Sequence, residues 1–224
     1  MRHALILAAG RGERMRPLTD ATPKPLLEVH GKPLIVHHIE KLAAADVRYI
    51  AINTSHLADQ FADVLGDGSR WGVRLRYSYE GPTPLETGGG MLKALPLLGS
   101  DPFIVVSADI WSDIDYAALP REPAGVAHLV MVPNPDFHPA GDFALADGLL
   151  HDAEAPAGAQ RLTFGNVGVY RPEMVAGETP GVFKLAPMYR RAIAAGRLSG
   201  ERFDGFWRNV GSPAQLDELR GIVG

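Results

Sequence analysis

Apolar runs and amphipathic segments alternate along the first half of the chain. Short apolar runs at residues 4–9 and 103–107 predict buried strands, because a strand that is covered on both faces has no polar side. Residues 33–45 carry apolar side chains at helical spacing, and residues 73–79 alternate as a half-exposed strand does. The pattern also predicts a strand at 48–53 and helices at 56–65 and 91–97. This alternation indicates a three-layer, Rossmann-like α/β fold with a mainly parallel mixed sheet.

The second half of the chain has a weaker pattern. Residues 137–160 are rich in proline, glycine, alanine and aspartate, and they predict only short strands near 143–144 and 149–150. The other expected elements are strands at 126–132, 161–171 and 207–211 and helices at 187–195 and 213–220. No linker-like composition divides the 224 residues, so a single domain is expected.

The composition is that of an ordinary soluble protein, with 46% hydrophobic and 21% charged residues. A net charge of -4 argues against a nucleic-acid partner, because there is no basic excess to neutralise a phosphate backbone. The absence of cysteine excludes disulfides and thiolate metal sites and indicates a reducing compartment. The apolar run at the N-terminus is too short for a signal peptide or a membrane span, so a cytoplasmic protein without a membrane partner is expected.

Glycine and positive charge occur together where the first predicted strand ends. Residues 10–16 read GRGERMR, which is the composition of a loop that wraps a polyphosphate. The dinucleotide fingerprint does not fit, because Met15 stands in place of its third glycine, and no Walker Gly-Lys-Ser/Thr follows. Pro23 and Pro25 flank Lys24 and are expected to hold it in a restrained, extended segment. An ordinary strand-to-helix turn with solvated arginines is the alternative.

Several further positions carry polar groups or glycines that packing does not explain. Asp109 follows a predicted buried strand, where an unpaired carboxylate is costly but is a natural ligand for magnesium. Residues 88–90 are three glycines expected just before a helix, where free backbone N–H groups admit a flat or anionic ligand; a flexible connector is the alternative. Asn166 lies inside a predicted strand, and its amide suits the reading of sugar hydroxyls. His37 and His38, by contrast, are expected to be packing residues.

The glycine loop reads G-x-G-x-R-M and is followed by P-L-T and P-K-P, and this run resembles the signature of the nucleotidyltransferases that make nucleoside-diphosphate sugars. The resemblance implies a nucleotidyltransferase fold in which about residues 1–110 bind a nucleoside triphosphate and about residues 111–224 bind a sugar 1-phosphate. It also implies that Arg11, Lys24 and Asp109 are catalytic. The two basic residues hold the phosphates, and the aspartate holds the metal, Mg²⁺.

Most of the remaining site residues are carried over by matching positions. Asn53 is instead a candidate because it ends the predicted strand at 48–53, where ligands of a parallel sheet gather, and Glu154 because it is expected to face the same site as Gly141. The nucleotide is expected to contact Leu7, Ala8, Ala9, Gly10, Arg11, Gly12, Lys24, Asn53, Pro84, Glu86, Thr87 and Gly88. The sugar phosphate is expected to contact Asp109, Gly141, Glu154, Asn166 and Lys184. The family usually has a second metal-binding aspartate at the position of Asn209, so the implied metal pair is Asp109 and Asn209. Metal binding should be weaker unless ligand phosphates supply the remaining oxygens or Asn209 coordinates through its carbonyl oxygen. Arg190 and Arg191 are expected to be solvated surface charges.

Within this family, the short length and the segments LETGGG, GDGS and FKLAP resemble the uridylyltransferases of peptidoglycan recycling that act on N-acetylmuramate 1-phosphate. The implied substrates are UTP and that sugar phosphate, and the implied products are UDP-N-acetylmuramate and pyrophosphate. A C-terminal β-helix domain, which longer relatives carry, is not expected, because the chain is short and shows no hexapeptide repeat. A monomer or weak homodimer is expected. The alternatives are a mannose-1-phosphate guanylyltransferase, a glucose-1-phosphate uridylyl- or thymidylyltransferase, and a non-catalytic sensor of sugar nucleotides.

Overall fold

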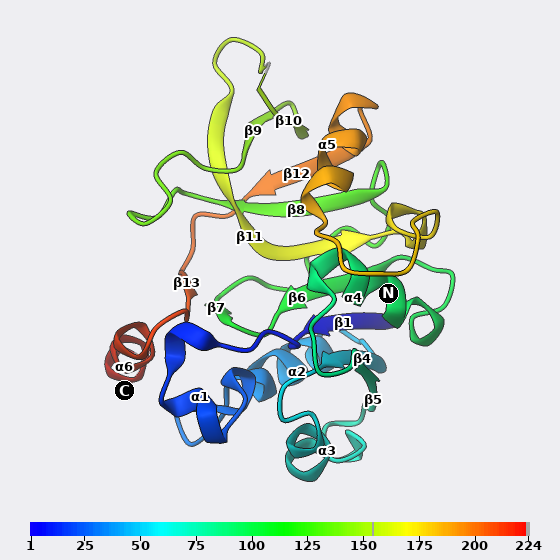
Figure 1. The fold of residues 1–224 in the computed structure, drawn as a ribbon. Coiled ribbons are helices and arrows are strands. Elements are labelled where there is room, and N and C mark those ends of the chain that lie inside the picture. The colour runs from blue at the N-terminus through cyan, green and yellow to red at the C-terminus, as the bar shows by residue number, and fades with distance from the viewer. Residues whose placement is uncertain (154, 223–224) are drawn as a thin grey trace.

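The computed structural model describes residues 1–153 and 155–222 (Figure 1). The helices are α1 (Leu18–Ala21), α2 (Leu34–Ala44), α3 (Asp59–Leu65), α4 (Glu86–Ala94), α5 (Ala186–Ala194) and α6 (Pro213–Ile222). The strands are β1 (His3–Leu7), β2 (Glu28–Val29), β3 (Lys32–Pro33), β4 (Tyr49–Thr54), β5 (Arg74–Tyr79), β6 (Phe103–Ser107), β7 (Ile110–Ser112), β8 (Ala127–Val132), β9 (Phe143–Ala146), β10 (Leu149–His151), β11 (Gln160–Tyr170), β12 (Leu198–Arg202) and β13 (Trp207–Asn209). Every helix and strand predicted in the first half is present, and α4 starts well before its predicted position. None of the helices in the described ranges is both long and apolar enough to cross a lipid bilayer.

A nine-stranded mixed sheet forms the middle of the molecule, in the order β5-β4-β1-β6-β11-β8-β12-β10-β9. β5, β4, β1 and β6 run parallel to one another, and helices make the connections between them. β11 is antiparallel to β6, β8 and β9, and β10 is antiparallel to both of its neighbours. The predicted α/β class is therefore correct, but the mainly parallel arrangement holds only for the first half of the chain.

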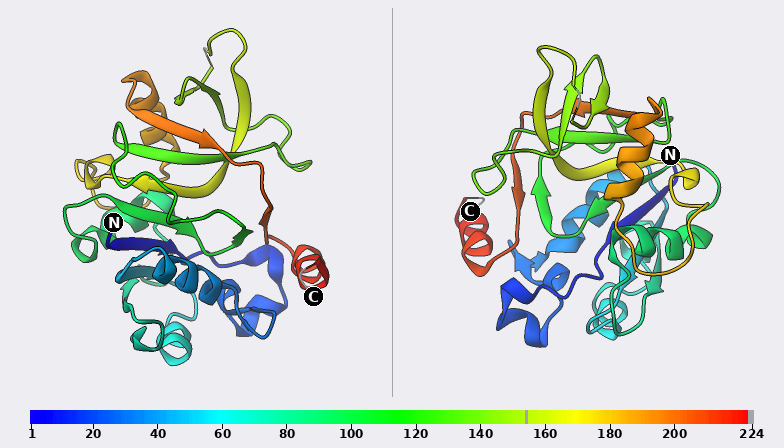
Figure 2. Two further views of the ribbon diagram at one scale, coloured as in Figure 1. Left: turned by 180° about the vertical axis from the view of Figure 1, so that it is seen from behind. Right: turned by 45° about the horizontal axis from the view of Figure 1, so that its top comes forward.

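The second half of the chain closes into a small barrel. β9 pairs with β10 on one side and with β11 on the other, so β11, β8, β12, β10 and β9 form a ring. β11 can serve both the main sheet and the barrel because it is 11 residues long and has a bulge, where its register with β8 shifts between Phe164 and Gly168. Figure 2 shows β11 curving between the two parts. The barrel is missing from the sequence prediction because β12, Leu-Ser-Gly-Glu-Arg, is not an apolar run.

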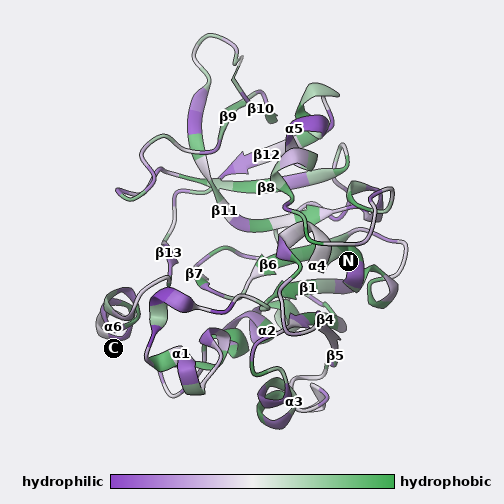
Figure 3. Ribbon diagram, in the orientation of Figure 1, coloured by the Kyte–Doolittle hydropathy of each residue, from purple (hydrophilic) through white to green (hydrophobic). Residues whose placement is uncertain are grey.

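Helices cover both faces of the main sheet. The side chains of β1 alternate between these faces, so Ala4 and Ile6 join the core formed with α2 and α3, whereas Leu5 joins the core formed with α4 and α5. Figure 3 shows β1 as hydrophobic and the loop that follows it as hydrophilic. The predicted three layers are therefore present, and chain polarity changes where β1 leaves the core.

A smaller core fixes the C-terminal helix against the loop after β1. Its buried members are Met15, Val29, Leu34, Val210, Leu216 and Leu219. α6 thus lies beside the glycine-rich loop although the two are at opposite ends of the sequence (Figure 1). Because Met15 is fully buried, it anchors the end of a loop whose other residues are largely exposed.

Candidate active site

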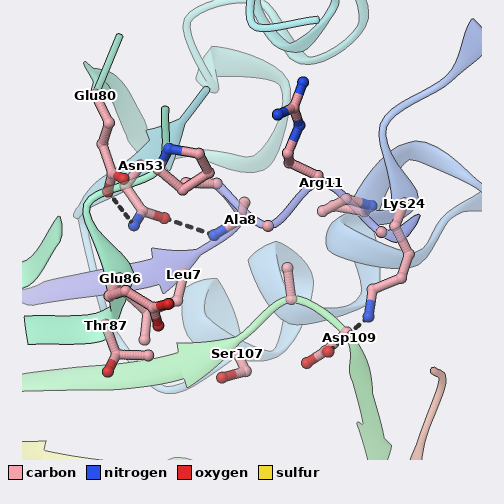
Figure 4. Close-up of a pocket in the computed structure, with 16 residues that line it drawn as sticks. Leu7, Ala8, Arg11, Lys24, Asn53, Glu80, Glu86, Thr87, Ser107 and Asp109 are labelled. Atoms are coloured by element: carbon pink, nitrogen blue, oxygen red, sulfur yellow. Dashed lines mark hydrogen bonds and ion pairs between the residues drawn. The ribbon is translucent and has the colours of Figure 1, made fainter. Parts of the chain in front are cut away.

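The candidate site lies where β1, β4 and β6 end. Leu7 is paired with Asn53 on one side and with Ser107 on the other, so the carboxyl ends of three parallel strands meet at one edge of the sheet. A cavity of about 350 Å³ opens there (Figure 4). It is lined by Leu7, Ala8, Ala9, Gly10, Arg11, Gly12, Lys24, Pro25, Asn53, Glu80, Pro84, Glu86, Thr87, Ser107, Ala108 and Asp109. Of the residues predicted to bind nucleotide, all except Gly88 line this cavity.

The loop after β1 turns back on itself at Gly12. This glycine has a φ of +65°, a left-handed backbone that other residues rarely adopt. A Cβ there would lie 2.9 Å from Thr19 Cγ2 and 3.2 Å from Lys24 Cβ, so a side chain would also be crowded. Thr19 Oγ1 closes the loop by donating to the Gly12 carbonyl oxygen at 2.9 Å. The turn creates an adjoining cavity of about 340 Å³ whose lining includes Arg11, Arg14 and Lys24, and this charge suits a polyphosphate.

Lys24 and Asp109 form an ion pair in the main cavity (Figure 4). Lys24 Nζ lies 2.6 Å from Asp109 Oδ2, and only 12% of the lysine side chain is exposed. The predicted extended backbone at Lys24 is wrong, because the residue begins a short 3-10 turn, Lys24–Leu26, in which Pro25 needs no N–H partner. A cation and an anion that are 85 residues apart in sequence therefore face one space.

A buried polar network closes the other end of the cavity (Figure 4). Asn53 Oδ1 accepts from the Ala8 N–H at 2.5 Å, and Asn53 Nδ2 donates to Glu80 Oε1 at 2.7 Å. Glu80 Oε2 accepts from the Leu85 N–H at 2.6 Å. Burial raises the pKa of Glu80, and these N–H donors oppose the shift. Glu80 is absent from the predicted site, although its place just after a parallel strand is the signal that singled out Asn53.

The three glycines lie inside α4, not before a helix as predicted, because α4 begins at Glu86. The N–H groups of Gly88 and Gly89 donate to the Phe183 carbonyl oxygen at 2.9 and 3.1 Å, so they are not available to a ligand. A Cβ at Gly88 would overlap the Phe183 ring, and one at Gly90 would overlap the network just described. These glycines therefore allow close packing of α4, and Gly88 does not reach the cavity.

A second large cavity, of about 400 Å³, adjoins the first on the side of the barrel. The lining residues common to both cavities are Leu7, Glu86, Thr87 and Ser107. Of the residues predicted at the sugar site, Asn166 and Lys184 line the second cavity, as does Asn209. Ligands bound in the two cavities would therefore lie next to each other and share these four lining residues.

The other predicted sugar contacts are arranged differently. Asn166 lies at the bulge of β11 with a φ of +58°, a conformation that is rare outside glycine and is often found at functional positions. Gly141 does not line the cavity, but its neighbour Asp142 does. Asp109 lines the first cavity and not the second. Glu154 is outside the described residues.

Asp109 and Asn209 are close in the backbone because β7 pairs with β13, which places Asn209 opposite Ile110. The Val210 N–H donates to the Asp109 carbonyl oxygen at 2.7 Å. Asn209 Oδ1 is buried and has no hydrogen-bond partner among the described residues, which is costly unless a cation or a donor reaches it. Within residues 1–153 and 155–222, no group of three or more histidine, cysteine, aspartate or glutamate side chains could hold a metal. One carboxylate and one amide oxygen therefore fit Mg²⁺ if ligand oxygens complete its coordination.

His38 supports the strand that follows Asp109. Its side chain is buried, its Nε2 donates to the Ile110 carbonyl oxygen at 2.9 Å, and its Nδ1 accepts from the Tyr116 hydroxyl at 2.9 Å. A carbonyl oxygen only accepts, so the contact with Ile110 fixes the tautomer of a neutral ring. Burial lowers the pKa of His38 to about 4. The residue thus packs in the core, as predicted, and also holds β7 in place.

Comparison with known sequences gives close relatives of similar length. The profile described as nucleotidyl transferase matches residues 3–133. The N-acetylmuramate alpha-1-phosphate uridylyltransferase of Neisseria meningitidis is 48% identical over 227 residues, which cover 99% of this chain and 98% of that protein. The protein of the same name from Caulobacter vibrioides is 38% identical over 223 residues, covering 94% and 92% of the two chains.

Solved structures share the fold at much lower identity. HddC from Yersinia pseudotuberculosis, crystallised with GMP-PN, matches with a TM-score of 0.80 at 19% identity and covers 100% of both chains. A Bacillus anthracis protein assigned as a glucose-1-phosphate thymidylyltransferase matches with a TM-score of 0.84 at 20% identity, over 99% and 95% of the two chains. The profile match and the full-length relatives together show that this chain belongs to the nucleotidyl transferase family.

Proposed function

We propose that the protein is an N-acetylmuramate α-1-phosphate uridylyltransferase, which joins the uridylyl group of UTP to N-acetylmuramate 1-phosphate and releases pyrophosphate. The observation that carries the proposal is the pair of adjoining cavities, one bordered by a basic glycine loop and the other by the barrel. The choice of base and sugar is supported by the similarity of the Neisseria meningitidis relative over nearly the whole of both chains.

The proposed reaction is an in-line displacement at the α-phosphorus of UTP. A phosphate monoester has a second pKa of about 6, so the attacking sugar phosphate is already charged near neutral pH and needs no general base. The protein has to neutralise two anions that repel each other and to align the attacking and leaving oxygens. Cations and backbone N–H groups are sufficient for this task, and a nucleophilic side chain is not required.

Lys24 and Arg11 bring positive charge to the triphosphate in this proposal. Lys24 is paired with Asp109 at 2.6 Å. An incoming triphosphate offers Lys24 a stronger anionic partner, and the carboxylate of Asp109 is then released for a cation. Lys184, from the loop before α5, holds the attacking phosphate in the second cavity.

Asp109 and Asn209 are the residues of this chain that would hold Mg²⁺. When bound, the ion neutralises charge on the phosphate oxygens. The buried Asn209 Oδ1, which has no partner in the described part of the chain, supports this assignment. Because an amide replaces the usual second carboxylate, the site carries less negative charge, and metal binding should depend on the nucleotide.

The test is a panel of substrates assayed for pyrophosphate release in the presence of Mg²⁺. UTP, dTTP and GTP are each combined with the 1-phosphates of N-acetylmuramate, N-acetylglucosamine, glucose and mannose. We expect the highest kcat/KM with UTP and N-acetylmuramate 1-phosphate. A higher value with another pair would contradict the proposed substrates, and binding without release for every pair would contradict the proposed reaction.

A further inference from the structure

We propose that Arg190 binds the carboxylate of the sugar substrate and thereby selects N-acetylmuramate 1-phosphate over sugars that lack this group. The inference rests on the proposed function. N-acetylmuramate differs from N-acetylglucosamine by a lactyl ether, whose carboxylate is ionised at neutral pH. The substrate therefore carries two separate anionic groups, its phosphate and its carboxylate, and each needs a cationic partner when it leaves water.

The barrel-side cavity has two basic side chains in its described lining, Lys184 and Arg190. Lys184 precedes α5, whereas Arg190 lies in the middle of this helix. Both side chains line the same cavity, one from the loop before α5 and the other from the helix itself. If Lys184 holds the 1-phosphate, Arg190 is the cation left for a second anionic group on the same sugar.

The geometry of α5 directs Arg190 toward the cavity. Ala186, Tyr189 and Arg190 all line it, and their i, i+3, i+4 spacing places them on one helix face. The next residue, Arg191, is not part of the lining and forms an ion pair with Glu178. The side chains of the two arginines are equally exposed, at 61% and 62%, so direction and not exposure distinguishes them.

Arg190 is held in position by Asp152. Its Nε donates to Asp152 Oδ2 at 2.9 Å, and the Asp152 carbonyl oxygen accepts from Arg161 Nη1 at 2.9 Å. A guanidinium has five N–H donors, so pairing through Nε leaves its other N–H groups for a ligand carboxylate. An arginine that is already oriented loses less side-chain entropy on binding and can form two parallel hydrogen bonds to the carboxylate.

Two acidic side chains, Asp142 and Glu86, also line this cavity, and neither occupies the place of Arg190. Asp142 accepts from the Phe164 N–H at 2.8 Å through one oxygen and contacts His138 Nε2 at 3.1 Å through the other, so its carboxylate is engaged within the protein. Glu86 lines both large cavities and therefore lies at their boundary. Asp152 offsets the charge of Arg190 but is bonded through Nε. The remaining N–H groups of the guanidinium are thus the feature that favours a carboxylate at the α5 side.

The decisive experiment compares N-acetylmuramate 1-phosphate with N-acetylglucosamine 1-phosphate, used as a substrate or as a competitive inhibitor. In Arg190→Gln we expect KM for the muramic sugar to rise about 10- to 50-fold, which is the range of a charge-assisted hydrogen bond at a partly exposed site. The kcat value, the KM for UTP and the affinity for N-acetylglucosamine 1-phosphate should stay within about twofold. Arg190→Lys should recover part of the loss, because it keeps the charge but not the two parallel N–H groups.

Arg191→Gln is the matched control, because it removes a neighbouring charge of equal exposure that does not face the cavity. It should leave the kinetics of both sugars unchanged. An Arg190→Gln enzyme that keeps its preference for the muramic sugar, or that loses affinity for both sugars equally, would overturn the role of Arg190 while leaving the proposed function intact. A wild-type enzyme that fails to use the muramic sugar would instead overturn the proposed function, and this inference with it.

Discussion

Replacing Gly90 with alanine should damage the first cavity, where the nucleotide is proposed to bind, although Gly90 does not line it. A Cβ at this position would lie 2.6 Å from Asn53 Nδ2 and still closer to Glu80 Oε1. Neither neighbour can move independently, because they share a hydrogen bond of 2.7 Å and also hold the N–H groups of Ala8 and Leu85. The substitution therefore has to open the network that forms one wall of the cavity.

The size of the effect follows from these contacts. Overpacking of this kind costs about 1–3 kcal/mol. Leaving a buried carboxylate and amide without partners costs about 1–3 kcal/mol more. Alanine recovers about 1 kcal/mol because it favours the helix over glycine. The net loss in the free energy of unfolding is therefore about 1–5 kcal/mol. It lowers the Tm of a chain of this size by about 2–20 °C.

Thermal unfolding of Gly90→Ala measures the loss of stability, and the KM for UTP measures the damage to the cavity. We expect both a lower Tm and a higher KM, because Leu85 and the segment beside it lose their anchor at Glu80. Gly177→Ala is the control, because no atom lies within 4 Å of a Cβ there and its backbone is not left-handed; its stability should change by less than about 0.5 kcal/mol. A Gly90→Ala protein with wild-type Tm and KM would refute the reasoning.

Three further predictions concern charge. Lys24→Met should lower kcat for pyrophosphate release about 10²–10³-fold, because it removes a cation from the reacting phosphates. Lys32→Met is the control, because it breaks only a partly exposed ion pair with Glu40 and should leave kcat unchanged. Equal rates for the two variants would exclude this role of Lys24. Asn209→Asp should reduce the Mg²⁺ concentration needed for half-maximal rate, and an unchanged midpoint in a Mg²⁺ titration would argue against the metal pair. The pKa of His38 is about 4 in the folded protein against an ordinary 6.5, so its contribution to stability is complete above pH 6.5 and is lost as the pH falls toward 4. The loss is about 2 kcal/mol at pH 5. Urea unfolding at pH 7.5 and pH 5 should therefore show a smaller difference in the free energy of unfolding for His38→Gln than for the wild-type protein. The same difference in both proteins would contradict this role of His38.

The first half of the fold could be predicted because its strands are covered on both faces. Such strands leave apolar runs, as in β1 and β6, and the helices between them carry regular apolar stripes. The barrel could not be predicted, because β12 carries serine, glycine and charged residues, and β9 and β10 are very short. Their pairing depends on the curvature of β11, which no local pattern reveals.

The site residues divide along the same line. Lys24 and Asp109 stood out from their local sequence, because each is a charge at the edge of an apolar or proline-bounded segment, and their catalytic roles stay predictions. Gly88 does not line the cavity as predicted, and its need for glycine comes from Phe183, which is distant in sequence. The directions of the Arg190 and Arg191 side chains likewise depend on how α5 packs against the barrel. The local sequence around the two arginines does not reveal this packing.

β11 has a consequence for how two substrates are brought together. Residues 167–170 hydrogen-bond to β6 beside the nucleotide cavity, and residues 160–162 hydrogen-bond to β9 in the barrel. One covalent strand therefore connects the surroundings of the two cavities, and under the proposed function it sets the spacing between the triphosphate and the sugar. An inhibitor that occupies both cavities would need a linker that matches this fixed distance. The length of the linker, more than any closing motion of the protein, should therefore decide how tightly the inhibitor binds.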